Sequence, residues 1–161
     1  MGRGQRALTT VYSELPTPWS VDLDEFGDYV AVRLQLSANT QRSYLADCRG
    51  LIDFMLRVTQ PGVDRTTIAE TDWSQLTLPL LRKWLSRDVM RGVAPATIAR
   101  HVASVRALCG WAVQTGRLAS DPSVRLQTPP AKKQLPQVVH QQQMDEVLSH
   151  LALSLIHISE P

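Results

Sequence analysis

The sequence lacks the features that mark membrane-embedded, secreted and metal-binding proteins. No stretch reaches the roughly 18 apolar residues of a membrane span, and residues 1–10 have no apolar centre like that of a signal peptide. Cys48 and Cys109 are its two cysteines, and neither has a cysteine or histidine at metal-ligand spacing. Both fall on apolar helix stripes, which indicates reduced core residues of a cytoplasmic protein. We therefore expect no membrane contact, no metal site and no cofactor.

Strand patterns are also missing, because no run alternates apolar and polar residues above background. Hydrophobic periodicity instead predicts four helices, and hence an all-α bundle, over about residues 20–34, 38–58, 78–91 and 95–115. Ser37 and Thr77 are the expected N-caps of the second and third helices, and Gly92 and Gly116 the expected stops of the third and fourth. Residues 60–76 are predicted to form a long connection that contains Trp73.

Acidic residues are absent between Val89 and Ser120. Residues 89–144 hold seven arginines or lysines against Asp121 alone, for a net charge of +6. Residues 1–88 hold ten such bases against eleven acids, for a net charge of −1. A basic block of this kind, inside a chain whose overall charge is only +2, indicates a polyanionic partner.

The fourth predicted helix has one apolar side and one small, polar side. Its expected buried stripe consists of Ile98, Val102, Val105, Cys109 and Ala112. The opposite side is expected to expose Ala96, Arg100, Ala103, Ser104 and Ala107. Arg100 should therefore be exposed and able to reach a ligand. Such a helix fits a duplex groove, and the alternative is an ordinary amphipathic surface helix.

The second predicted helix repeats this composition at its N-terminal end. Its buried stripe is expected to contain Tyr44, Leu45, Cys48, Ile52 and Met55. Its other side begins with Asn39, Arg42, Ser43 and Ala46, which are again small and polar around one arginine. Two helices with the same kind of exposed end favour a shared binding surface.

Four sequence motifs, in this order, resemble the core-binding domain of tyrosine recombinases, the phage-integrase family, most closely of the Xer type. Ser37 to Thr40 with Tyr44 is similar to the S-x-x-T-x-x-x-Y pattern of that family's second helix. Thr97 to Arg100 with Val105 and Arg106 is similar to the T-I-x-R pattern and following arginine of its fourth helix. Asp121-Pro122 stands where the family usually has Asn-Pro, and Lys132 to Pro136 resembles its interdomain linker.

The resemblance implies a SAM-like helical bundle that forms half of a clamp around duplex DNA. It implies a recombination half-site as the ligand, with no small-molecule substrate, and a parent enzyme that works as a tetramer with itself or a related recombinase, with chromosome dimer resolution as one role. The implied DNA-contacting residues, with the linker lysines, are Thr40, Gln41, Arg42, Ser43, Thr97, Arg100, His101, Ser104, Lys132 and Lys133. A packing role for His101, and a flanking or paired role for Arg106, are equally compatible with the pattern.

The chemistry of that family uses a tyrosine nucleophile with arginines, a histidine and a lysine, and needs neither ATP nor metal. These groups belong to its C-terminal domain. Here the tyrosines are Tyr12, Tyr29 and Tyr44, and no H-x-x-R occurs. We therefore expect a chain truncated before its catalytic domain, with no catalytic residues, that binds DNA without cutting it.

The expected organisation has five parts. Residues 1–18 form a loose arm, 19–121 the core-binding domain and 122–136 a basic, proline-containing linker. Residues 137–152 form a helical stub of the catalytic domain, and 153–161 an aberrant or read-through tail. A non-catalytic helical DNA-binding regulator and a protein-interaction bundle are the alternatives. The two basic helices are separated in the sequence by a whole helix and a long connection, which argues against a helix-turn-helix regulator. The basic block argues against an interaction bundle.

Overall fold

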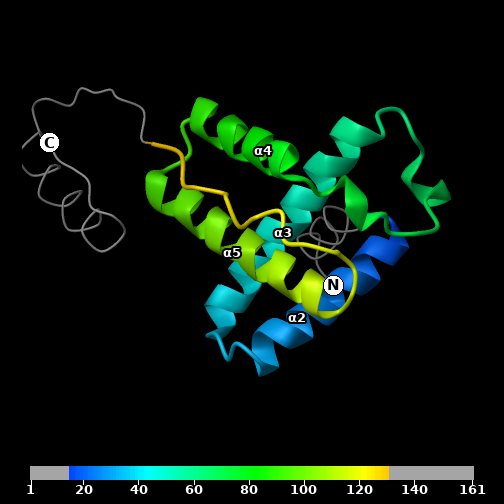
Figure 1. Ribbon diagram of the computed structural model, residues 1–161, viewed down its shortest axis with the longest axis horizontal. Helices are drawn as coiled ribbons and strands as arrows, with labels where there is room; N and C mark the ends of the chain where they lie inside the picture. Colours follow the sequence, from blue (N-terminus) through cyan, green and yellow to red (C-terminus); the bar gives the residue numbers. More distant parts are fainter. Residues whose placement is uncertain (1–14, 131–161) are drawn as a thin grey trace, which may run out of the picture. The chain divides into compact units, whose positions relative to one another are not determined.

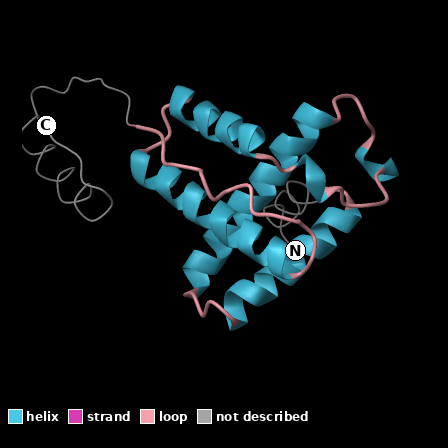
Figure 2. Cartoon of the chain, viewed as in Figure 1, coloured by secondary structure: helices cyan, strands magenta, loops and turns pink. Residues whose placement is uncertain are grey.

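Four α-helices and two 3₁₀ turns form the regular structure of residues 15–130, the part that the computed structural model describes (Figure 1, Figure 2). The elements are α2 (Thr17–Val32), α3 (Ala38–Thr59), η1 (Arg65–Thr67), η2 (Trp73–Gln75), α4 (Leu78–Met90) and α5 (Pro95–Gln114). Within this range there is no β-strand, which confirms the predicted all-α bundle.

The helix starts follow the capping residues that the sequence supplies. The Ser37 hydroxyl accepts a hydrogen bond from the Thr40 N–H at 3.2 Å, and Thr77 accepts one from the Leu80 N–H at 3.3 Å. Both predicted N-caps are thereby confirmed. At α5, Ala94 occupies the N-cap position without a side-chain hydrogen bond, and Pro95 begins the helix with a backbone that has no N–H to satisfy.

Gly92 and Gly116 end α4 and α5 in the same way. Their φ angles are +75° and +81°, which residues with a Cβ adopt at a cost. In each case the glycine N–H bonds the carbonyl three residues back, and the next N–H bonds the carbonyl five residues back. This is the Schellman arrangement, and it turns the chain sharply after each helix.

Helices α3 and α5 together form the centre of the bundle. They pack against each other, and each also packs against α2 and α4 (Figure 1). Every member of the predicted α5 stripe is buried: Ile98, Val102, Val105, Cys109 and Ala112. On α3, Cys48, Ile52 and Met55 are buried as predicted, whereas Tyr44 and Leu45 near its start are half-buried.

The connection between α3 and α4 is anchored to the core. Trp73 is 4% exposed and lies 4.9 Å from the Trp19 ring and 6.0 Å from the Trp111 ring, centroid to centroid. Its indole N–H donates to Asp22 at 2.8 Å. A segment expected to be a loop therefore supplies a core aromatic residue, with its polar group satisfied.

Helix α2 begins at Thr17, earlier than the predicted start at Ser20. It also ends at Val32, two residues before the predicted end at residue 34, and Leu34 is 37% exposed. The early start places Asp22 in the second turn, from where its carboxylate reaches Trp73 and Arg117, which follows the end of α5.

The start of the predicted 122–136 linker lies against the bundle. Ser123 and Leu126 are each 1% exposed, and the Leu126 carbonyl accepts a hydrogen bond from Arg106. The Asp121 carboxylate holds this turn by accepting hydrogen bonds from the Ser123 N–H at 2.8 Å and the Ser123 hydroxyl at 2.6 Å. The remainder of the linker from residue 131, and the expected stub and tail, lie outside the described residues.

Candidate nucleic-acid interface

The N-terminal end of α3 carries four of the predicted DNA-contacting residues: Thr40, Gln41, Arg42 and Ser43. Arg42 is exposed and its guanidinium donates to the Asn39 side-chain oxygen. The Thr40 hydroxyl accepts from the Ser37 hydroxyl at 3.0 Å, and the Gln41 amide donates to the main-chain carbonyl just before Ser37 at 2.8 Å. Arg42 is therefore the cation that this end of α3 presents to solvent.

Helix α5 is rotated from the orientation that the sequence predicts. Ser104 is completely buried and the His101 side chain is 14% exposed, while Thr97 is half-buried. The exposed residues between the start of α5 and Arg106 are Pro95, Ala96, Ala99, Ala103 and Arg106, so Ala96 and Ala103 are exposed as predicted. The exposed face thus lies toward Ala99 and Arg106, and the expectation that Ser104 is exposed is wrong.

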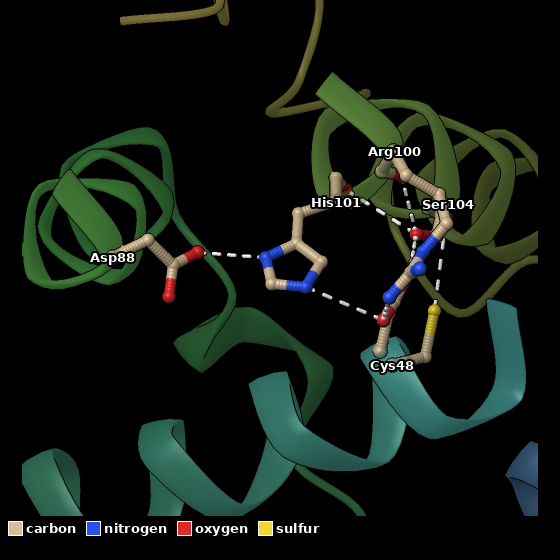
Figure 3. A network of polar contacts seen from close by, with 6 residues as sticks. Cys48, Asp88, Arg100, His101 and Ser104 are labelled. Carbon is tan, nitrogen blue, oxygen red and sulfur yellow. Dashed lines mark hydrogen bonds and ion pairs between the residues drawn. The ribbon is translucent and has the colours of Figure 1, made fainter. Parts of the chain in front are cut away.

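A buried carboxylate on α3 is the centre of a polar network between α3, α4 and α5. The side chain of Asp47 is 4% exposed. Its Oδ2 accepts from Arg100 Nε at 2.9 Å and from the Ser104 hydroxyl at 2.8 Å, and its Oδ1 accepts from Arg100 Nη2 at 2.7 Å. Figure 3 shows Arg100, His101 and Ser104 coming from one helix, with Cys48 below them and Asp88 on the far side of His101.

Arg100 is therefore a paired arginine. Its guanidinium forms a bidentate ion pair with a residue 53 positions away in the sequence, a partner absent from the predicted site. Bidentate pairs are the strongest arginine–carboxylate geometry, and they fix the plane of the guanidinium. The Arg100 side chain nevertheless remains 41% exposed, so part of this side chain faces solvent.

His101 connects α5 to both neighbouring helices. Its Nδ1 lies 2.7 Å from an Asp88 oxygen, its Nε2 lies 3.4 Å from Asp47 Oδ1, and its ring stacks on Trp84 at 5.0 Å between centroids. Asp88 is 3% exposed and lies in the last turn of α4, where the helix dipole disfavours a negative charge. These contacts place His101 in a packing role, one of the two that its sequence position allowed.

Protonation follows from these contacts. Burial alone would raise the pKa of Asp47, but hydrogen bonds from His101, Arg100 and Ser104 outweigh burial and lower it to about 2. Contacts with Asp47 and Asp88 raise the pKa of His101 above its ordinary value of 6.5, against the effect of burial. A protonated imidazole can donate to both carboxylates at once, whereas the neutral ring has one N–H.

Asp47 and Asp88 were absent from the predicted site. A helical wheel contains a signal for each, because both lie among buried positions of their helices. Asp47 is three residues after Tyr44 and four before Leu51, and Asp88 is three residues after Leu85. A carboxylate on an apolar stripe requires a cationic partner, but the sequence does not say which one.

The basic block is partly neutralised by acids from elsewhere in the chain. Besides Arg100, Arg117 pairs with Asp22 and with Glu25, each at 3.0 Å, and lies over the Trp111 ring at 4.3 Å. Arg91, Arg106 and Arg125 are the remaining cations of this block within residues 15–130, and all three are exposed. The net charge of the sequence segment therefore overstates the charge that it offers to a partner.

Of the remaining residues considered in the sequence analysis, the structure describes Arg106 but not the two linker lysines. Lys132 and Lys133 lie outside the described residues. Arg106 donates to the Leu126 main-chain carbonyl, a flanking role of the kind its position suggested. No group of histidine, cysteine, aspartate or glutamate within residues 15–130 could hold a metal ion, and no helix in that range is long and apolar enough to cross a membrane.

Comparison with known proteins relates this site to one family. The family described as "Phage integrase, N-terminal SAM-like domain" matches residues 23–116, which include α3, α4 and α5. The tyrosine recombinase XerC of Mycobacterium sp. (strain JLS) is 41% identical over 126 residues, covering 78% of this chain and 39% of that protein. The tyrosine recombinase XerC of Mycobacterium bovis (strain BCG / Pasteur 1173P2) is 40% identical over 121 residues, covering 75% and 37%.

No solved structure gave a significant match. The chain spans about two fifths of the length of the curated relatives that it matches. The match nevertheless covers more than half of the present sequence, and it includes the motifs at the starts of α3 and α5 and the whole Asp47 network. By its N-terminal SAM-like domain, this chain therefore belongs to the phage-integrase family of tyrosine recombinases, and it is similar to the Xer type.

Proposed function

We propose that this chain is the DNA-binding half of a site-specific tyrosine recombinase, and that it binds one half-site of duplex DNA. The observation that carries the proposal is that two helices in contact, α3 and α5, each expose short side chains beside an arginine. Ala46 and Gly50 are exposed on α3, and Ala96, Ala99 and Ala103 on α5. Such a surface allows the backbones of both helices to approach a polyanion closely.

Each of the two helices contributes one arginine to the proposed surface. Arg42 is exposed near the start of α3, and Arg100 of α5 is held by Asp47 of α3 with its side chain 41% exposed. Arg42 and Arg100 are therefore the proposed principal contacts, with Thr40, Gln41, Ser43 and Thr97 beside them and Lys132 and Lys133 as further phosphate contacts. Ser104 is left out of this proposal because its hydroxyl is buried and bonded to Asp47.

Further parts of the proposal rest on the family relationship. The whole recombinase cuts and rejoins DNA through a tyrosine, works as a tetramer in the cytoplasm and serves chromosome dimer resolution. The present sequence has no H-x-x-R motif, so we propose that this chain by itself binds DNA without cleaving it.

The test is a fluorescence-anisotropy titration of the full chain with labelled duplex DNA across a series of salt concentrations. If about four to six phosphates are contacted, log K falls against log salt with a slope of roughly −4 to −5. A flat salt response, or no binding at low salt, contradicts the proposal and favours a protein-interaction bundle.

A matched pair of arginine variants locates the surface. Arg42→Ala should weaken binding, whereas Arg82→Ala, which removes an exposed arginine of α4 outside the proposed contacts, should leave it nearly unchanged. Equal losses in the two variants would show that binding depends on overall charge and not on the ends of α3 and α5.

A further inference from the structure

We propose that Asp47 is a positioning residue for DNA recognition: it holds one edge of the Arg100 guanidinium so that the opposite edge is presented to a pair of adjacent acceptor atoms on duplex DNA. This inference rests on the proposed function and adds a buried acid to the binding apparatus. Asp47 would contact no DNA itself.

The atoms that form the pair determine which edge of the guanidinium is left over. Asp47 accepts hydrogen bonds from Nε at 2.9 Å and from Nη2 at 2.7 Å. We call the edge that carries these two donors the side edge, and the edge between Nη1 and Nη2 the end edge. A guanidinium carries five N–H donors, so three are left, and they belong to Nη1 and Nη2 at the end edge. Among residues 15–130 no hydrogen bond or ion pair involves Nη1 of Arg100. The Asp47 side chain is 4% exposed and the Arg100 side chain is 41% exposed, and we infer from this contrast that the edge away from Asp47 faces solvent.

Asp47 is itself held in place from a second direction. The Ser104 hydroxyl donates to Oδ2 at 2.8 Å and lies 2.7 Å from the Arg100 main-chain carbonyl, one turn back along α5. His101 Nε2 lies 3.4 Å from Oδ1 (Figure 3). Because the carboxylate cannot rotate without breaking these contacts, the guanidinium plane is fixed before DNA arrives. A fixed arginine loses less side-chain freedom on binding than a mobile one.

The surroundings leave the outer edge accessible. The exposed residues next to Arg100 on α5 are Ala96, Ala99 and Ala103, and Ala46 is exposed on α3 beside Asp47. The end edge of a guanidinium matches two acceptors side by side, which duplex DNA offers as guanine O6 and N7 or as two phosphate oxygens. The shared chemistry is thus a bidentate acceptor pair, and binding data distinguish its two sources.

The test exploits the sign of the charge effect. Removing a carboxylate near DNA should strengthen binding if charge alone matters, because less repulsion remains. If Asp47 positions Arg100, Asp47→Asn should weaken binding of the full chain to labelled duplex, by about the same factor as Arg100→Ala. In the Arg100→Ala background, Asp47→Asn should cause no further loss. Asp28→Asn removes an exposed acid from α2 and serves as the matched control, with unchanged or slightly tighter binding expected.

Two further arms keep the result interpretable. Arg100→Lys retains the charge but presents no second edge, so it should bind DNA more weakly than wild type. If Arg100→Lys binds DNA with wild-type affinity, the inference is overturned, and this holds even if Asp47→Asn does not fold. Comparing a duplex selected by the wild-type chain from a random library with one of arbitrary sequence identifies the acceptor. A base contact predicts a loss of about five- to 150-fold on the selected duplex alone, and a phosphate contact predicts an equal loss on both.

The outcomes also separate this inference from the proposed function. If the wild-type chain fails to bind any duplex at low salt, the proposed function is wrong. If the wild type binds and Asp47→Asn binds as well or better, while folded at the assay temperature, only the positioning role of Asp47 is wrong.

Discussion

Arg100→Ala should destabilise the bundle, a result that inspection of α5 alone would not suggest. The substitution removes both donors that Arg100 gives to the buried Asp47 carboxylate. Removing one partner of a fully buried ion pair costs about 3–5 kcal/mol. Two features reduce that figure here: the Arg100 side chain is 41% exposed, and Ser104 and His101 still contact Asp47. We therefore expect a loss of about 2 kcal/mol in the free energy of unfolding.

The measurement is thermal unfolding followed by circular dichroism. For a domain of this size, about 2 kcal/mol corresponds to a fall in Tm of about 10 °C. Arg42→Ala is the matched control, because Arg42 is exposed and its hydrogen bond goes to the side chain of Asn39, which is also exposed. Surface substitutions of that kind stay within about 0.5 kcal/mol.

Acid provides an independent check on the mechanism. The pKa of Asp47 is lowered to about 2, so its contribution to stability is present above the ordinary value of 3.8 and is lost as the pH falls through about 2. The difference in stability between wild type and Arg100→Ala should narrow over that range. If Arg100→Ala melts like Arg42→Ala at neutral pH, the bidentate pair contributes nothing measurable and the reasoning is refuted.

Three further predictions concern the histidine, the core and the chemistry. Because the pKa of His101 is raised, its contribution to stability is complete below about pH 6.5 and is lost as the pH rises through the higher pKa of the folded state. Melts of His101→Gln should therefore show a weaker decline in Tm with rising pH than melts of the wild type. Parallel curves of Tm against pH would contradict the bridge from His101 to Asp47 and Asp88. Val102 is 3% exposed, so Val102→Ala should lower the free energy of unfolding by about 1–3 kcal/mol in the same melts. Val124 is 74% exposed, so Val124→Ala should leave stability nearly unchanged. Equal effects of the two substitutions would mean that α5 packs by another face. With a suicide recombination substrate, the chain should give no covalent adduct on a denaturing gel, and a tyrosine-linked adduct would disprove the proposed lack of cleavage.

The helices and the apolar core were predictable because the signals for them are local. Caps at Ser37 and Thr77, stops at Gly92 and Gly116 and the stripe of α5 each depend on residues within a few positions of one another. The same local patterns, taken in order, indicated the family. Residues 60–76 mark the limit of this approach, because polar loop composition gave no sign that Trp73 would complete an aromatic cluster with Trp19 and Trp111.

The electrostatics of the candidate site were decided by tertiary structure. Between Val89 and Ser120 the sequence offers no acid, so its arginines appear unpaired when the segment is considered alone. Folding brings Asp47 to Arg100 across 53 positions and Asp22 to Arg117 across 95. A buried carboxylate must find a cation, but helix packing determines which one arrives. The sequence by itself determined where the helices form and where the arginines stand in them. The packing of α5 against α3 decided that Arg100 is held by a buried acid and that Ser104 is buried in the bundle. The physical reason is that only packing sets the rotation of one helix against another.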